Sequence, residues 1–134
     1  MTRVLFVCVG NSGRSQMAEA LAKRLGEGVI EAESAGTRPA RKLNETVIEV
    51  MSEIGYDMGD QYPKMLTLDM MKSADRVISM GCGVSTEAVC PATLVPTEDW
   101  GIQDPERQPI EKVRDIRDVI KGNVERLVKE ISNE

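Results

Sequence analysis

The hydrophobic positions of this chain follow two periods. Continuous apolar runs are typical of strands buried on both faces of a parallel sheet, and apolar residues every three or four positions predict amphipathic helices. Runs or short extended segments of the first kind lie at residues 4–7, 29–34, 77–80 and 94–95. Segments of the second kind lie at residues 14–25, 45–54 and 109–131. Since the two kinds alternate, we expect one α/β domain, residues 1–134, with helices packed on a parallel sheet.

The same pattern predicts the structural roles of three side chains. Asn44 is a good N-cap for the second helix, and Ile48 is expected on the apolar face of that helix. Met65 lies in a segment that we interpret as a loop, where a methionine most simply fills a gap in the core.

Composition and charge exclude several classes of function. Apolar residues make up 41% and charged residues 29% of the chain, as in soluble globular proteins. The net charge is −5 and no basic run occurs, which argues against nucleic acid or an anionic membrane as a partner. Without a membrane-length apolar stretch or signal-peptide features, a cytoplasmic protein is expected. The chain has no histidine, which excludes imidazole-activated nucleophiles and imidazole metal sites.

The most informative stretch joins the first strand to the first helix. Backbone N–H groups of a tight loop, with a helix N-terminus behind them, attract a tetrahedral oxyanion and favour a thiolate at Cys8. Gly10 and Gly13 allow close approach of the backbone, and the Arg14 guanidinium can hold two oxygens of the anion. The stretch therefore predicts a nucleophilic cysteine in an oxyanion site, rather than a buried cysteine beside an ordinary turn. Its residues are Cys8, Val9, Gly10, Asn11, Ser12, Gly13, Arg14 and Ser15.

A cysteine, five intervening residues and then Arg-Ser, after an N-terminal strand, resemble the low-molecular-weight protein tyrosine phosphatase superfamily. The string from Cys8 to Glu19 is more similar to the arsenate reductase branch of that superfamily than to its phosphatases. The resemblance covers essentially the whole chain. It implies a three-layer sandwich around a four-stranded parallel sheet in the order 2-1-3-4. It also implies a role in arsenic detoxification, with arsenate in the loop and phosphate or sulfate as competing anions.

Three cysteines are an odd number, which suits redox turnover in a reducing compartment better than a static disulfide framework. Cys82 follows the third strand, on the same sheet edge as Cys8, and Cys90 lies close enough in sequence for a disulfide with Cys82. The resemblance implies a relay in which Cys8 attacks arsenate, Cys82 attacks Cys8, and Cys90 attacks Cys82. The disulfides Cys8–Cys82 and Cys82–Cys90 would form in turn, and thioredoxin or a similar dithiol would reduce the second.

Two other interpretations of these thiols remain open. Cys82 and Cys90 could be incidental buried cysteines, or all three thiols could form a zinc site. The chain also departs from the best-known members of the branch, which often carry a cysteine at the position of Gly13. The spacing around Cys82 differs as well, and this leaves open which external reductant docks.

Asp104, directly before Pro105, resembles the general acid of the superfamily, which would protonate the oxygen that leaves arsenic. An Asp-Pro pair is also a common turn initiator, and Asp99 is the second candidate for the acid. Trp100 is expected to pack this loop against the domain.

Asn11, Glu19 and Ser34 match positions that surround a potassium ion in related thioredoxin-coupled reductases. A further acidic ligand of those proteins aligns with Lys64 in this chain. We hypothesise that the Lys64 ammonium takes the place of the cation, so no resident metal is expected.

Three functions remain open at this point. The preferred one is thioredoxin-coupled arsenate reduction by a monomer, with phosphatase activity as a side reaction. The second is a protein tyrosine phosphatase that uses Cys8, Arg14 and Asp104 alone. The third is an oxyanion sensor that binds without turnover, which would have little use for an acid and a transferable disulfide.

Overall fold

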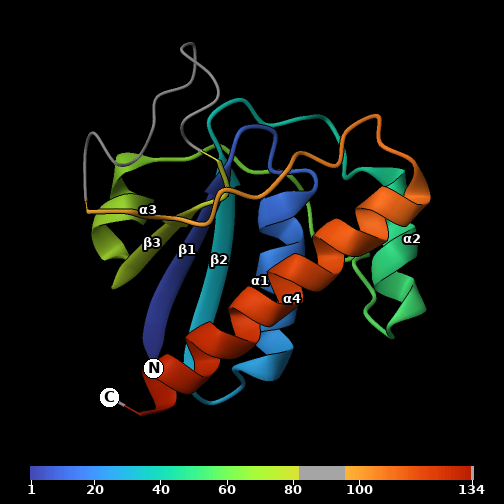
Figure 1. The fold of residues 1–134 in the computed structure, drawn as a ribbon. Coiled ribbons are helices and arrows are strands. Elements are labelled where there is room, and N and C mark those ends of the chain that lie inside the picture. The colour runs from blue at the N-terminus through green and yellow to red at the C-terminus, as the bar shows by residue number, and fades with distance from the viewer. Residues whose placement is uncertain (82–95, 134) are drawn as a thin grey trace.

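A computed structural model describes residues 1–81 and 96–133 of the chain (Figure 1). The elements follow one another as strand, helix, strand, two helices, two strands and a long helix. Their bounds are β1 Thr2–Cys8, α1 Arg14–Leu25, β2 Ile30–Gly36, α2 Glu45–Glu53, α3 Leu68–Ser73, β3 Arg76–Ser79, β4 Glu98–Asp99 and α4 Ile110–Ser132.

The strands form one parallel sheet in the order β2-β1-β3-β4, which confirms the expected topology. In the centre of the sheet Val4 pairs with Ala32 on one side and with Arg76 on the other. The β1 segment reads as a continuous apolar run because both of its faces are covered, as the burial of residues 4–7 shows.

Helices cover both faces of the sheet, so the three-layer sandwich is confirmed (Figure 1). On one face α1, α2 and α4 enclose the larger core, in which Phe6, Met17 and Ile120 are fully buried. On the other face the short α3 encloses a smaller cluster that contains Leu5, Val77 and Met71. The apolar stripe predicted for the C-terminal helix forms the core-facing side of α4.

Two of the side-chain assignments were wrong. The face of α2 that packs inward consists of Val47, Val50 and Met51, whereas Ile48 is 39% exposed. Met65 is 57% exposed, because its backbone forms a parallel bridge to Gly36 at the edge of the sheet and its side chain is not drawn into the core. The predicted N-cap is confirmed, since the Asn44 side chain accepts hydrogen bonds from the N–H groups of Thr46 and Val47.

The predicted strand at 94–95 lies outside the described residues, and the fourth strand that the structure describes is β4, at Glu98–Asp99. Because all strands are parallel, their carboxyl ends share one edge of the sheet. Figure 1 shows the loops that follow β1, β2 and β4 gathered at that edge. The site is therefore built where three segments distant in sequence meet.

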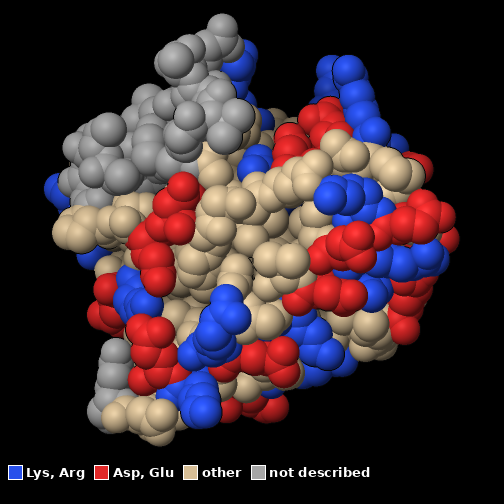
Figure 2. All heavy atoms as spheres, viewed as in Figure 1, with Lys and Arg blue, Asp and Glu red and all other residues tan. Residues whose placement is uncertain are grey.

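Charged side chains of both signs share the surface. On the face shown in Figure 2, basic and acidic residues interleave over α2 and α4. Ion pairs such as Arg114 with Glu53, at 2.7 Å, belong to this arrangement. Among the described residues, no helix combines the length and the apolar character that crossing a bilayer requires.

Candidate active site

Cys8 ends β1 and its sulfur faces hydrogen-bond donors of the loop that follows. The backbone N–H of Asn11 donates to Cys8 Sγ at 3.2 Å, and the Ser15 hydroxyl oxygen lies 2.8 Å from the same sulfur. The sulfur also lies near the N-terminus of α1, a helix of 12 residues whose dipole favours negative charge at that end. The sulfur therefore faces a backbone N–H, a hydroxyl group and the positive end of a helix dipole.

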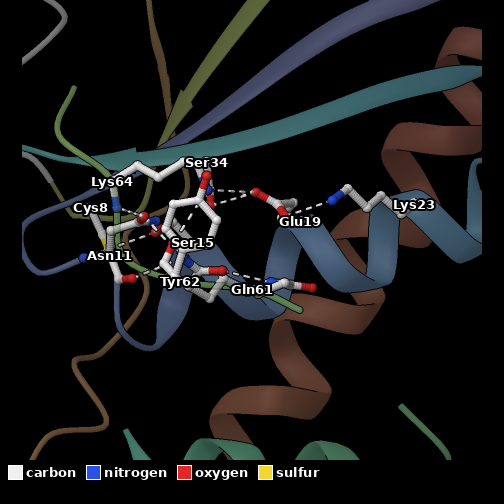
Figure 3. A network of polar contacts seen from close by, with 10 residues as sticks. Cys8, Asn11, Ser15, Glu19, Lys23, Ser34, Gln61, Tyr62 and Lys64 are labelled. Atoms are coloured by element: carbon white, nitrogen blue, oxygen red, sulfur yellow. Dashed lines mark hydrogen bonds and ion pairs between the residues drawn. The ribbon is translucent and has the colours of Figure 1, made fainter. Parts of the chain in front are cut away.

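Asn11 holds the loop in shape from inside the protein. Its backbone is left-handed, with φ of 50°, and its side chain is fully buried. The side-chain Nδ2 donates to Ser15 Oγ at 2.7 Å, while Oδ1 accepts the N–H of Lys64 at 2.8 Å (Figure 3). Asn11 and Ser15 were both expected in the oxyanion site. Their side chains instead lie buried behind the loop and support it, and the backbone N–H of Asn11 faces the sulfur.

Two glutamines outside the predicted site residues complete this support. The buried Gln16 Nε2 donates to both Asn11 O and Asn11 Oδ1 at 3.0 Å and to Tyr62 O at 2.9 Å. Gln61 Nε2 in turn donates to Gln16 Oε1 at 2.6 Å. A signal was present in the sequence, because Gln16 is a polar residue in the first turn of α1, directly before the apolar pair Met17-Ala18.

The segment that follows β2 engages the carbonyl groups of the loop. The N–H groups of Thr37, Arg38 and Ala40 donate to the carbonyl oxygens of residues 8, 9 and 10 respectively, at 2.9–3.2 Å. These carbonyl oxygens are bonded within the protein, so their negative ends do not turn toward an incoming oxyanion.

A cleft of about 670 Å³ opens above the loop and brings three of the predicted catalytic side chains together. Cys8 and Arg14 line it from the loop, and Asp104 lines it from the segment after β4. Asp104 is exposed, and its Oδ1 accepts the N–H of Glu106 at 3.0 Å. The cleft is lined by Cys8, Val9, Gly10, Ser12, Gly13, Arg14, Arg38, Ala40, Lys42, Leu43, Asn44, Glu45, Thr46, Asp104, Pro105 and Glu106.

Asp99, the second candidate for the acid, lies elsewhere. Its Oδ1 accepts from the Ser79 hydroxyl at 2.9 Å, and it lines a different cavity together with Arg76. Trp100 packs against the core as expected, with its ring centroid 5.6 Å from that of Phe6. The geometry therefore favours Asp104 over Asp99 as the acid.

Gly13 lies directly under the loop that carries Asp104. A Cβ at this position would lie 3.0 Å from Pro105 Cγ. The missing side chain thus allows Pro105, next to Asp104, to pack closely on the start of α1.

Of the predicted cation residues Asn11, Glu19 and Ser34, the last two are in direct contact, at the buried carboxylate of Glu19. The side chain of Glu19 is only 4% exposed, and its Oε1 accepts from the Ser34 hydroxyl at 2.7 Å. Lys64 Nζ lies 3.6 Å from the same oxygen, and Lys23 Nζ lies 2.8 Å from Oε2 (Figure 3). The charge of Glu19 is thus balanced by lysines. In the described part of the chain, no group of three or more Cys, Asp or Glu side chains is placed to hold a metal ion.

Cys82 and Cys90, the two further predicted redox residues, lie outside the described residues. Gly81, the residue before Cys82, is described and lies beside the cleft-lining Arg14, since a Cβ built on it would be 2.9 Å from Arg14 Nη1.

The known proteins that this chain resembles include both phosphatases and arsenate reductases. The family described as low molecular weight phosphotyrosine protein phosphatase matches residues 3–134. A glutaredoxin arsenate reductase of Synechocystis sp. is 40% identical over 133 residues, which cover 98% of this chain and 100% of that protein. The thioredoxin-dependent arsenate reductase of Corynebacterium glutamicum is 38% identical, with a TM-score of 0.80 over 98% of this chain and 62% of that one. The YwlE arginine phosphatase of Geobacillus stearothermophilus is 27% identical, with a TM-score of 0.86 over 99% of this chain and 94% of that one.

Proposed function

This chain belongs to the low molecular weight phosphotyrosine protein phosphatase family, and we propose that within it the protein is an arsenate reductase that uses Cys8 as nucleophile. The observation that carries the proposal is the cleft in which Cys8, Arg14 and Asp104 meet. The arsenate reductases among its relatives support the choice of substrate.

In the first step the Cys8 thiolate attacks arsenic, a sulfur–arsenic bond forms, and an arsenic–oxygen bond breaks. Asp104 supplies the proton with which the expelled oxygen leaves as water. Arg14 and the loop N–H groups stabilise the negative oxygens of arsenate during this step. Phosphate and sulfate, which have the same tetrahedral shape, compete for the same loop.

The reduction itself needs a second thiol. Cys82 attacks the Cys8 sulfur, a disulfide forms, and the electron pair of the broken sulfur–arsenic bond stays on arsenic, which leaves as arsenite. Cys90 then attacks Cys82, which frees Cys8 and leaves the Cys82–Cys90 disulfide for an external dithiol to reduce. This relay is proposed from the sequence, and thioredoxin or glutaredoxin is the class of reductant that the names of the relatives suggest.

We also propose that Lys64 replaces the potassium ion of related reductases. Its ammonium lies 3.6 Å from Glu19 Oε1, and its backbone N–H bonds to Asn11 Oδ1. One fixed positive charge can therefore support the anion loop from behind without a bound cation. A monomer in a reducing cytoplasm is the setting in which this chemistry is expected.

The lining of the cleft disfavours an aryl phosphate as the main substrate. The chain has four aromatic residues, namely Phe6, Tyr56, Tyr62 and Trp100, and none is among the residues that line the described cleft. A phosphotyrosine ring would therefore find no aromatic wall to stack on. Glu106, at the cleft, adds a like charge against an acidic phosphopeptide. Phosphatase activity is expected only as a side reaction.

The test is arsenate-dependent oxidation of NADPH in the presence of thioredoxin and thioredoxin reductase, with a parallel arm that uses glutaredoxin and glutathione. Wild type should turn over in at least one arm, and Cys8→Ser, Cys82→Ser and Cys90→Ser should each stop turnover. Phosphatase assays on phosphotyrosine and phosphoarginine give the control, because only Cys8→Ser should abolish them. Full arsenate turnover by Cys82→Ser and Cys90→Ser would refute the relay, and binding without turnover in either arm would favour a sensor.

A further inference from the structure

Arg14 is anchored by a backbone group of the segment that follows β4. Its Nη1 donates to the carbonyl oxygen of Ile102 at 3.0 Å. Ile102 is itself fixed, because its N–H donates to the carbonyl oxygen of Met80 at 2.6 Å and only 6% of the residue is exposed. A guanidinium has five N–H donors, so this bond leaves others for an oxyanion.

Gly81 lies against the same guanidinium. A Cβ on Gly81 would be 2.9 Å from Arg14 Nη1, which is closer than real Cβ contacts, and 3.5 Å from the Ile102 carbonyl oxygen, which is an ordinary contact. Among the described residues, the only atom that a methyl group would crowd is thus the tip of the flexible Arg14 side chain. The backbone of Gly81 is not in the left-handed region, so alanine would cause no backbone strain there.

We propose that Gly81 and the Ile102 carbonyl are positioning elements that hold the Arg14 guanidinium where it binds the oxyanion. An arginine side chain loses rotamer entropy when it is ordered. If the carbonyl bond orders it before the anion arrives, that loss does not weaken anion binding. A side chain at residue 81 would displace Nη1 from Ile102 and remove this preorganisation. The inference rests on the proposed role of Arg14 as an oxyanion ligand.

The variant Gly81→Ala tests this with inorganic phosphate as the probe. In a Cys82→Ser/Cys90→Ser background Cys8 is the only thiol, and protection of Cys8 from iodoacetamide by phosphate gives a dissociation constant that needs no turnover. We expect Gly81→Ala to weaken phosphate binding on the order of tenfold, the cost of ordering one long side chain on binding. The thermal midpoint should stay within a few degrees of the parent, because only a flexible side chain is displaced.

Two controls separate a positioning role from a structural one. Gly122→Ala, on α4 with open space around its Cβ, should leave phosphate binding unchanged. In an Arg14→Lys background, which lacks Nη1, Gly81→Ala should change phosphate binding less than twofold, since the group it displaces is gone. In arsenate turnover by the three-thiol protein, Gly81→Ala should raise KM about tenfold and change kcat less than twofold, because bound arsenate draws the guanidinium back.

Unchanged phosphate binding in Gly81→Ala would overturn the proposal. So would an equal loss in the Arg14→Lys background, or a loss that comes with a collapse of the thermal midpoint, since either assigns Gly81 to something other than Arg14. Failure of the proposed function would look different, because wild type would bind phosphate through Arg14 and yet not reduce arsenate.

Discussion

Replacement of Asn11 by alanine is expected to damage both stability and catalysis, by amounts that follow from its contacts. Alanine at a left-handed position costs roughly 1 kcal/mol more than asparagine or glycine. Loss of Oδ1 leaves the Lys64 N–H without its acceptor, and loss of Nδ2 removes the bond to Ser15 Oγ. These two unpaired groups cost roughly 2 kcal/mol together. Gln16 adds no further cost, because its Nε2 keeps the carbonyl oxygens of residue 11 and Tyr62 as acceptors. The expected destabilisation is therefore about 3 kcal/mol.

The variant Asn11→Gly separates the two contributions. Glycine adopts the left-handed conformation freely but lacks the same polar groups, so we expect a loss of about 2 kcal/mol. Urea unfolding of wild type and both variants gives these values, and Asn123→Ala, on α4 and not in the cleft lining, serves as the control. Because the Asn11 N–H faces Cys8 Sγ at 3.2 Å, a displaced loop should also slow arsenate turnover at least about tenfold.

Two outcomes would refute this reasoning. Equal stability of Asn11→Ala and Asn11→Gly would show that the left-handed backbone carries no cost. Normal arsenate turnover in a destabilised Asn11→Ala protein would show that the buried network does not hold the loop on the sulfur.

Three further changes test other parts of the molecule. Asp104→Asn should lower kcat for arsenate by about 10²-fold or more while Asp99→Asn changes it less than twofold, as steady-state kinetics would show. Wild type should respond equally to potassium and sodium in melting temperature and turnover, whereas Lys64→Asp should become potassium-responsive; a marked potassium effect on wild type would contradict the replacement. Arg114 holds the pKa of Glu53 below its ordinary 4.5, so this carboxylate stabilises the fold above that value and ceases to do so as the pH falls through its lower folded pKa. Urea unfolding should therefore show wild type to be more stable than Glu53→Gln at pH 7, with the difference vanishing in acid.

The loop and the sheet could be predicted because their signals are local. The residues from Cys8 to Ser15 are contiguous, and their chemistry and spacing suffice to predict an oxyanion site at a strand–helix junction. The stripe of α4 is long enough for its period to be unambiguous. Asp104 needed the resemblance as well, because an Asp-Pro pair alone is equally a turn signal.

The parts that could not be predicted depend on contacts between distant segments. The bond from Gln61 to Gln16 joins residues 45 positions apart, and no period marks it. In α2 the residues Val47, Ile48, Val50 and Met51 form too wide an apolar surface for sequence to say which edge is buried, and packing against α4 selects Val50 over Ile48. The helix α3 buries only Met71, so it has no amphipathic pattern to detect.

The most direct measurement is a single turnover without any external reductant. Fully reduced protein, mixed with excess arsenate, is assayed for arsenite and then for free thiols after denaturation. Reduction of arsenic from the +5 to the +3 state takes two electrons, which one disulfide supplies. We therefore expect one equivalent of arsenite per protein and a fall from three free thiols to one. The Cys8→Ser variant should form no arsenite and should keep both of its thiols. No arsenite, or arsenite formed while all three thiols persist, would contradict nucleophilic reduction by Cys8.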